Sequence, residues 1–217
     1  MRFVFEQIRT GGDRNFAYLV GDRQERVAVI VDPSYDPDGV VERATAQGLS
    51  VEYIINTHGH PDHTNGNGRA RELTGAPLAA YRESRVSPDV KLGDGDELEV
   101  GSVLLRFTHV PGHCDDHLLI HLPREKVALT GDLIFVGKIG GTDSDDAARL
   151  EFESLRKALG ELPDETTIWP GHDYGCRPSS TVALEKATNP FLLAADIDAF
   201  LDLKAKWSSF KAERGLR

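Results

Sequence analysis

The sequence predicts an α/β fold in which two β-sheets are covered by helices. Two observations favour this fold: strand-like and helix-like segments are mixed in both halves of the 217 residues, and one short motif follows a strand-like segment in each half. The motif reads Val-Pro-Gly-His at 110–113 and Trp-Pro-Gly-His at 169–172, which hints at a two-fold construction. Because no Pro-, Ser- or Gly-rich linker divides the chain, we expect residues 1–217 to form a single domain.

The first half is expected to begin with strands and to continue with helices. Runs of β-branched and aromatic residues, separated by turn signals, predict strands at 3–8, 16–20, 27–31 and 51–56. Val40, Val41 and Ala44 recur at helical spacing, so a helix is expected over 38–47, with Gly48 at its end. A loop at 57–64 and a helix at 65–74 complete this half.

The second half repeats this arrangement with more strands. Strands are expected at 103–110, 118–122, 126–130 and 166–169. Helices are expected at 146–159, 178–187 and 196–212. Asp143, Asp145 and Asp146 precede or begin the first of these helices, where negative charge complements the helix dipole. Trp207 and Phe210, on the last helix, are expected to be core contacts.

The charge balance excludes several classes of partner. Lys+Arg 25 against Asp+Glu 35 gives a net charge of −10, which opposes binding to nucleic acid or to an anionic membrane. No apolar run approaches the roughly 20 residues that cross a bilayer, and the first residues lack the pattern of a signal peptide. Cys114 and Cys176 are too few for a disulfide framework. We therefore expect a cytoplasmic protein, and the sequence indicates no particular oligomeric state.

The segment 57–63, Thr-His-Gly-His-Pro-Asp-His, carries the strongest chemical signal. Imidazole and carboxylate groups at this density are typical of a site for zinc, iron or manganese, because calcium and magnesium prefer oxygen ligands alone. A turn through Pro61 brings Asp62 and His63 close to the point that His58 and His60 face. One loop can thus contribute to two adjacent ion sites, although it completes neither.

Further ligands are expected from three residues in similar settings. His113, Asp132 and His172 each follow a predicted strand, and each comes directly after a glycine. In open α/β sheets, ligands gather at the carboxyl ends of the strands, which is the reason to group these residues with 57–63. Taken singly, each of them can also be an ordinary loop residue. His117 and His121 share one face of the strand 118–122, and His117 is a candidate for orienting a metal ligand.

These motifs resemble the ligand loops of the metallo-β-lactamase superfamily. The ordered set is THGHPDH at 57–63, PGH at 111–113, TGD at 130–132 and PGHDY at 170–174, and the resemblance spans about residues 15–193. Within the superfamily the chain is most similar to glyoxalase II-like (hydroxyacylglutathione hydrolase) proteins. The resemblance implies an αββα four-layer sandwich.

The resemblance also implies a site with two divalent ions, zinc first, with iron or manganese as alternatives. His58, His60 and His113 would hold one ion, Asp62, His63 and His172 the other, and Asp132 would bridge them. A hydroxide shared by two ions would attack a thioester carbonyl, with Asp62 and Asp132 as the catalytic carboxylates. The expected function is hydrolysis of a glutathione thioester such as S-lactoylglutathione.

Substrate recognition departs from the family's pattern. Glyoxalase II enzymes commonly use a basic residue and a tyrosine nine and eleven positions after the bridging aspartate, where this chain has Gly141 and Asp143. They also use basic residues in a C-terminal helical extension, for which Lys204, Lys206, Lys211 and Arg214 are the candidates here. The expected substrate-binding residues near the ligand loops are Tyr174, Lys138 and Arg177.

Two other functions remain open. A persulfide dioxygenase of the same superfamily would act on glutathione persulfide with a single iron, held by His58, His113 and Asp132. That family commonly shows Gly-Arg-Thr-Asp where this chain has Gly-Gly-Thr-Asp at 140–143. A protein that binds metal without catalysis is the further alternative. A ligand set rich in His and Asp argues against it, because structural zinc sites are usually closed cages rich in Cys. A small thiol-derived substrate is the expected partner.

Overall fold

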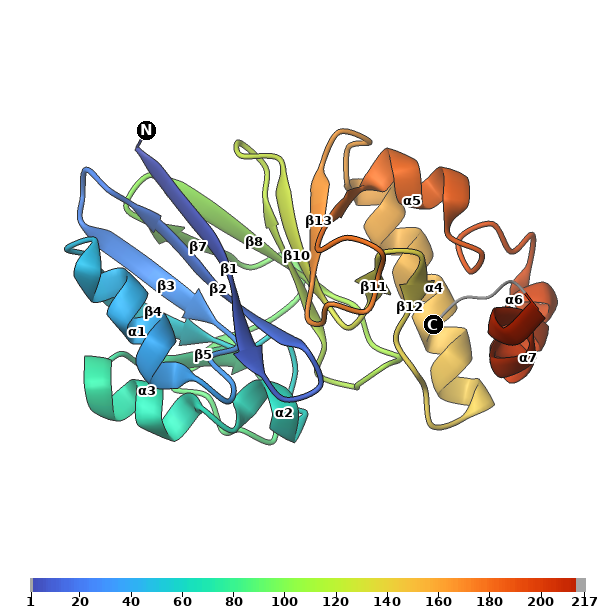
Figure 1. Cartoon of the computed structure of the whole chain (residues 1–217), viewed down its shortest axis with the longest axis horizontal. Coiled ribbons are helices and arrows are strands. Elements are labelled where there is room, and N and C mark those ends of the chain that lie inside the picture. Colours follow the sequence, from blue (N-terminus) through green and yellow to red (C-terminus); the bar gives the residue numbers. More distant parts are fainter. Residues whose placement is uncertain (1, 214–217) are drawn as a thin grey trace.

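The computed structural model describes residues 2–213, and these form four layers, helix, sheet, sheet and helix (Figure 1). Two six-stranded sheets pack face to face, and each sheet has helices on its outer side. This arrangement confirms the predicted sandwich. Within the described residues, no helix has both the length and the hydrophobicity that a membrane crossing requires.

The first sheet has the strand order β1-β2-β3-β4-β5-β6. Its strands are β1 (Phe3–Gly11), β2 (Asn15–Asp22), β3 (Val27–Val31), β4 (Ser50–Ile55), β5 (Leu78–Tyr81) and β6 (Val90–Leu92). The first three strands are antiparallel, and β3 to β6 are parallel. The helices of this half are α1 (Pro37–Ala46), α2 (Pro61–Thr64) and α3 (Asn67–Thr74). Apolar residues of α1 and α3 pack on the outer face of this sheet.

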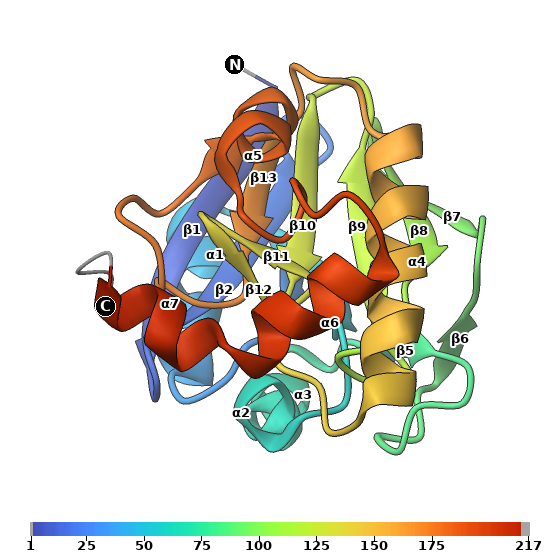
Figure 2. The same cartoon turned by 90° about the vertical axis from the view of Figure 1, so that its right-hand side faces the viewer.

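The second sheet has the strand order β14-β13-β10-β9-β8-β7. Its strands are β7 (Glu97–Val100), β8 (Val103–His109), β9 (Leu118–Leu122), β10 (Val127–Gly131), β13 (Thr167–Pro170) and β14 (Ser180–Thr181). A separate hairpin consists of β11 (Ile134–Phe135) and β12 (Lys138–Ile139). The helices are α4 (Asp145–Glu161), α5 (Val182–Thr188), α6 (Ile197–Ala205) and α7 (Trp207–Glu213). α4 lies along the sheet, and α6 and α7 lie beside the hairpin (Figure 2).

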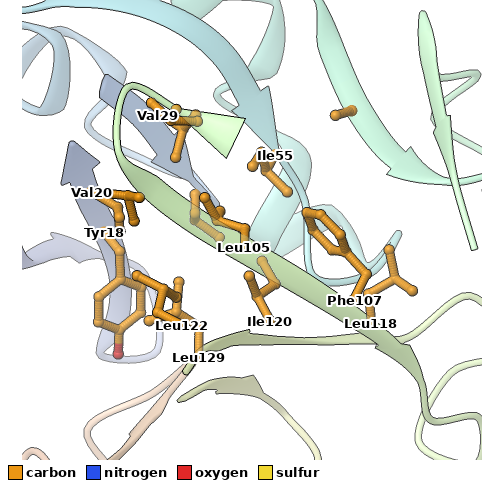
Figure 3. Packing of buried hydrophobic residues seen from close by; sticks show 14 of the residues in the cluster. Tyr18, Val20, Val29, Ile55, Leu105, Phe107, Leu118, Ile120, Leu122 and Leu129 are labelled. Atoms are coloured by element: carbon orange, nitrogen blue, oxygen red, sulfur yellow. The ribbon is translucent and has the colours of Figure 1, made fainter. Parts of the chain in front are cut away.

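The main core lies between the two sheets. Val20, Val29 and Ile55 of the first sheet face the second sheet across this layer, and all three are fully buried (Figure 3). In β8 and β9, alternate residues point into this core, as the two-residue period of a strand requires. Their neighbours, such as Leu119, point to the other face and pack under α4.

The structure differs from the sequence-based prediction in several elements. No strand was expected between 75 and 102, where β5, β6 and β7 lie. The expected helix 178–187 was wrong at its start, because 180–181 pair with β13 and Thr181 caps the helix by accepting from the backbone N–H of Leu184 at 3.2 Å. The expected helix 196–212 is two helices, which meet at Lys206. The expected loop 57–64 contains the short helix α2.

Strand direction brings the ligand loops together. β10 and β13 are parallel, and β8 runs the same way because both β8 and β10 are antiparallel to β9. The carboxyl ends of these three strands therefore lie at one edge of the second sheet. The loop that follows β4 approaches this edge from the first sheet, as the hydrogen bond from the Leu118 N–H to the Thr57 carbonyl shows (2.7 Å).

Candidate metal centre

Seven side chains from five segments meet at this edge. His58 and His60 lie in the loop after β4, Asp62 and His63 lie in α2, and His113, Asp132 and His172 follow β8, β10 and β13. Ligand atoms lie within 4.8 Å of one another in three groups: His58, His60 and His113; His58, His63 and Asp132; and Asp62, His63 and His172. The structure thus brings together every residue that the sequence proposed as a metal ligand.

The first group is formed by three imidazoles, His58, His60 and His113. The Nδ1 atom of His60 lies 3.1 Å from Nε2 of His58 and 3.1 Å from Nε2 of His113. Two ligands of a tetrahedral ion, each about 2.0–2.1 Å from the metal, are about 3.3 Å apart. The spacing of these nitrogens therefore suits a single cation between the three rings.

The second group has a similar spacing. Nε2 of His63 lies 3.2 Å from Nε2 of His172, and Oδ2 of Asp62 lies 3.3 Å from the latter atom. Asp132 stands between the two groups: its Oδ1 is 3.4 Å from Nε2 of His63, and its Oδ2 is 3.6 Å from Nε2 of His113. One carboxylate thus reaches residues of both groups.

The outer nitrogens of four rings have acceptors that fix the tautomer. Nδ1 of His113 bonds to the Gly141 carbonyl at 2.7 Å, Nδ1 of His172 to the Asp13 carbonyl at 2.9 Å, and Nδ1 of His63 to the Asp32 carboxylate at 3.0 Å. These acceptors carry no hydrogen, so in each pair the histidine donates. Nδ1 of His58 donates to Thr57 Oγ1, because that hydroxyl gives its own hydrogen to Asp32.

A cation is the partner that this arrangement fits. When Nδ1 carries the hydrogen of a neutral imidazole, Nε2 presents a lone pair, and the Nε2 lone pairs of His63 and His172 face one another at 3.2 Å. Facing lone pairs repel until a proton or a metal ion lies between them. In addition, Oδ1 of Asp132 is buried and has no hydrogen-bond partner among the described residues. Outer acceptors of this kind are usual for metal-binding histidines.

The protonation states point to the same conclusion. Burial lowers the pKa of His58 well below its ordinary value. Burial also lowers the pKa of His172, but the carboxylates of Asp132 and Asp62 outweigh this effect and raise it to about 9. The pKa of Asp62 is well below its usual range, first because of its bond to His172. Without a metal, protons on the histidines balance the carboxylates, and a cation takes over that role when it binds.

Two residues that the sequence analysis did not identify support the ligands. Asp32, at the end of β3, accepts hydrogen bonds from Thr57 and His63. Asn15, at the start of β2, donates from Nδ2 to the carbonyl of Asp62 (3.0 Å) and to its Oδ2 atom (3.1 Å). Asp32 offers a signal that could have been used, since it follows a strand as the ligands do.

Close packing explains the glycine that precedes His172. A Cβ atom at Gly171 would lie 2.4 Å from Oδ1 of Asp132 and 2.7 Å from Cε1 of His63. Only a residue without a side chain permits this approach of the β13 loop to the ligands.

The expected substrate-binding residues lie beside the second group. The ring of Tyr174 stacks on that of His172 with centroids 4.5 Å apart, and its hydroxyl donates to Asp13. Nζ of Lys138 lies 3.9 Å from the centre of the Tyr174 ring. Arg177 bonds to Ser180 and lies farther along the same surface, where it lines a groove with Lys138 and Tyr174. Cys114 is not a ligand, since its thiol donates to Asp116.

A groove of about 510 Å³ adjoins the centre between the loop 139–145 and helices α6 and α7. Lys138, Trp207 and Lys211 line it, and the same three residues line the neighbouring groove of about 420 Å³. Trp207 packs on Phe191, as expected for a core contact, but it also faces these grooves. Arg214 lies outside the described residues.

Comparisons with known proteins agree with this geometry. The model of the metallo-beta-lactamase superfamily matches residues 10–172. The chain is 33% identical over 201 residues to the human protein named persulfide dioxygenase ETHE1, mitochondrial, which covers 88% of this chain and 75% of the relative. It is also 33% identical over 177 residues to the hydroxyacylglutathione hydrolase of Polaromonas sp., with 79% and 67% covered.

Among solved structures, the crystal structure of ETHE1 from Myxococcus xanthus superimposes with a TM-score of 0.86 at 30% sequence identity. The superposition covers 94% of this chain and 91% of the other. Both the ligand loops and the full length of the fold thus support the resemblance seen in the sequence. The chain belongs to the metallo-β-lactamase superfamily.

Proposed function

We propose that this protein is a persulfide dioxygenase that uses one iron ion and acts on a small thiol-derived persulfide, with glutathione persulfide as the substrate. The sequence alone favoured hydrolysis of a glutathione thioester. The observation that carries the present proposal is the likeness to the structure of ETHE1 from Myxococcus xanthus, which extends over more than nine-tenths of both chains. Relatives named persulfide dioxygenase agree with it.

The iron would be held by His58, His113 and Asp132. Two histidines and one carboxylate, with positions left open, are the ligand set of non-haem iron oxygenases, in which the iron binds and activates dioxygen beside the substrate. His58 and His113 are held from outside by Thr57 and by the Gly141 carbonyl, so their Nε2 atoms stay directed at the site. The overall reaction adds dioxygen to the outer sulfur of the persulfide, and with water it yields sulfite and the free thiol.

Lys138 and Tyr174 would orient the thiol carrier. The ammonium group of Lys138 lies over the Tyr174 ring and, within the described residues, makes no ion pair. It is therefore free to bind a carboxylate of glutathione in the adjoining groove. The persulfide dioxygenase pattern has an arginine where this chain has Gly141, and Lys138 supplies a positive charge near that loop. Arg177, in the second groove, is assigned a weaker contact with the same ligand.

Thioester hydrolysis is the second candidate, and the geometry of Asp62, His63 and His172 favours it. A single-iron oxygenase does not require these residues as ligands, yet their ligand atoms converge as closely as those of the first group. Two ions bridged by Asp132 would generate a hydroxide nucleophile at neutral pH, and Asp62 would orient it. Hydroxyacylglutathione hydrolases are among the relatives, with identities that overlap those of the persulfide dioxygenases.

One purified preparation can separate the two functions. The protein is loaded with Fe²⁺ under anaerobic conditions, its metal content is measured, and it is mixed with glutathione persulfide in aerated buffer. Oxygen uptake matched by sulfite formation, at one iron per chain, is the expected result. Zinc-loaded protein is assayed in parallel with S-lactoylglutathione. Thioester cleavage at two metals per chain, with no oxygen uptake by the iron form, would overturn the proposal in favour of the hydrolase.

We also propose that the protein acts in the cytoplasm. Both cysteines are free, which suits a reducing compartment. The named mammalian relatives are mitochondrial, so fractionation of cells that express the chain is the direct test.

A further inference from the structure

We propose that His117 is a positioning residue that fixes Asp132 and His58, although it binds no metal itself. It lies just before β9 and is fully buried. Its Nε2 atom lies 3.0 Å from the backbone nitrogen of Asp132 and accepts that N–H. Its ring also packs on the ring of His58, with centroids 4.9 Å apart and planes at 21°. One side chain thus contacts two of the three proposed iron ligands.

The bond to Asp132 matters because its carboxylate has little other support. Oδ1 has no hydrogen-bond partner within residues 2–213, and the groups near both oxygens are the metal-ligand histidines themselves. The direction of the carboxylate therefore depends on the backbone at 131–132. Gly131 has φ +47°, and a Cβ atom there would lie 2.7 Å from Nε2 of His117. The backbone turns at this point directly against the His117 ring.

The bond to Asp132 fixes the tautomer of His117 and offsets an unfavourable feature of this residue. Since Nε2 accepts the Asp132 N–H, Nδ1 carries the hydrogen of the neutral ring. That Nδ1 atom is buried and has no partner among the described residues. An unsatisfied buried donor costs about 1–3 kcal/mol, a cost that an apolar residue of the same size would avoid. The bond to Asp132 is the compensating feature.

The substitution His117→Phe tests this inference. Phenylalanine keeps the ring and its packing on His58 but cannot accept the Asp132 N–H. We expect the affinity for Fe²⁺, measured anaerobically by competition with a chromophoric chelator, to fall about 10- to 100-fold. We also expect a changed visible spectrum of the Co²⁺-loaded protein, because the Asp132 ligand moves. The variant His117→Gln, whose Oε1 can take the place of Nε2, should recover most of the affinity.

His121→Phe is the matched control. His121 lies on β9, the strand that follows His117, and also has a buried ring nitrogen without a partner in the described part of the chain, but its strand neighbours are Ala128 and Arg106, which belong to no ligand loop. It should keep wild-type iron affinity. The stability of the metal-free protein provides a second readout: His117→Phe removes one unsatisfied N–H and leaves another at Asp132, so its unfolding midpoint should stay close to that of wild type.

Two results would overturn the inference. The first is wild-type metal affinity and an unchanged Co²⁺ spectrum in His117→Phe. The second is a large loss of stability in the metal-free variant that accounts for the loss of metal, which would make His117 a structural residue. The inference rests on the proposed function only in taking Asp132 and His58 as metal ligands. Because metal binding is measured without substrate, failure of the oxygenase assay would be a separate result.

Discussion

At the scale of single residues, Asn15 shows how a distant part of the chain controls one ligand. It is fully buried, and it donates to both the carbonyl and Oδ2 of Asp62, from which it is separated by 47 positions. Asn15→Asp keeps the size of the side chain but removes the donor and sets a second negative charge beside Asp62. We expect an ion bound by Asp62, His63 and His172 to be held about 10- to 100-fold more weakly, as measured by Zn²⁺ competition titration.

The control for this variant is Asn189→Asp. Asn189 is also fully buried and donates two hydrogen bonds from Nδ2, to the Lys138 carbonyl and to Glu185, neither of which is a proposed metal ligand. It should carry a comparable folding cost and leave Zn²⁺ binding unchanged. If Asn15→Asp bound zinc as wild type does, the assigned role of Asn15 would be wrong.

His172 makes the stability of the metal-free protein depend on pH. Its pKa is about 9 in the folded chain, against about 6.5 when unfolded, so its proton stabilises the fold. This contribution is complete below pH 6.5 and is lost as the pH rises through 9. Chelator-treated wild type should therefore lose about 1–2 kcal/mol more stability between pH 7 and pH 9 than His172→Gln does. Urea unfolding measures the difference, and parallel pH profiles of the two proteins would contradict it.

At the scale of elements, a buried ion pair connects α4 to α6. Glu151 on α4 is fully buried and pairs with Nζ of Lys204 on α6, which also donates to the Gly140 carbonyl at 3.2 Å. Burial raises the pKa of Glu151 to about 7, so this residue takes up a proton when its partner is removed. We expect Lys204→Met to cost about 2 kcal/mol at pH 7, somewhat less than the usual loss for a broken buried pair, as measured by urea unfolding.

The pH and a double variant check the origin of this loss. In Lys204→Met, Glu151 is buried without its partner, so the folded protein favours its protonated form. Keeping this proton costs more free energy as the pH rises, so the loss of stability should grow above pH 7. The double variant Lys204→Met/Glu151→Leu removes the buried charge entirely and should regain at least half of the lost stability. A double variant no more stable than the single one would show that the pair is not the cause.

Longer strands with a clear run of apolar core positions could be predicted from the sequence, and the shortest strands could not. β2, β3, β8 and β9 are runs of five to eight residues with clear core positions. β5, β6 and β7 have only three or four residues each, which is too short for an alternation of apolar and polar positions to stand out. The break at Lys206 likewise has no local signal such as proline or glycine.

The metal ligands were predictable because four of them lie within six positions, 58–63, and the others follow strands. Their supporting residues were harder to predict. Asn15 and the Asp13 carbonyl reach the site only because the β1–β2 turn folds against the β13 loop, a contact between opposite ends of the chain. A single sequence carries no spacing rule for such a contact.

At the scale of the whole molecule, the charge around the centre opposes the charge of the protein. The net charge is −10, yet three positive side chains, Lys138, Lys211 and Arg14, lie close together. Burial is the largest cause that lowers the pKa of Lys138, and the positive charges of Lys211 and Arg14 lower it further. Neither Lys138 nor Lys211 makes an ion pair within residues 2–213. The lysines of the grooves beside the centre therefore attract an anion, although the net charge of the protein repels one.

The salt dependence of KM separates attraction of the substrate by the lysines from its repulsion by the net charge. In wild type, added salt screens the nearby lysines, so KM for glutathione persulfide should rise with ionic strength. In the double variant Lys138→Gln/Lys211→Gln, KM at low salt should be about fivefold higher, as expected for the loss of two exposed ion pairs worth about 1 kcal/mol together. With the lysines gone, repulsion by the net charge dominates, and salt should now lower KM. A persulfide whose carrier has no carboxylate is the control, since its KM should respond little to the double variant. If salt changed KM in the same direction for both proteins, the two lysines would not be the source of the attraction.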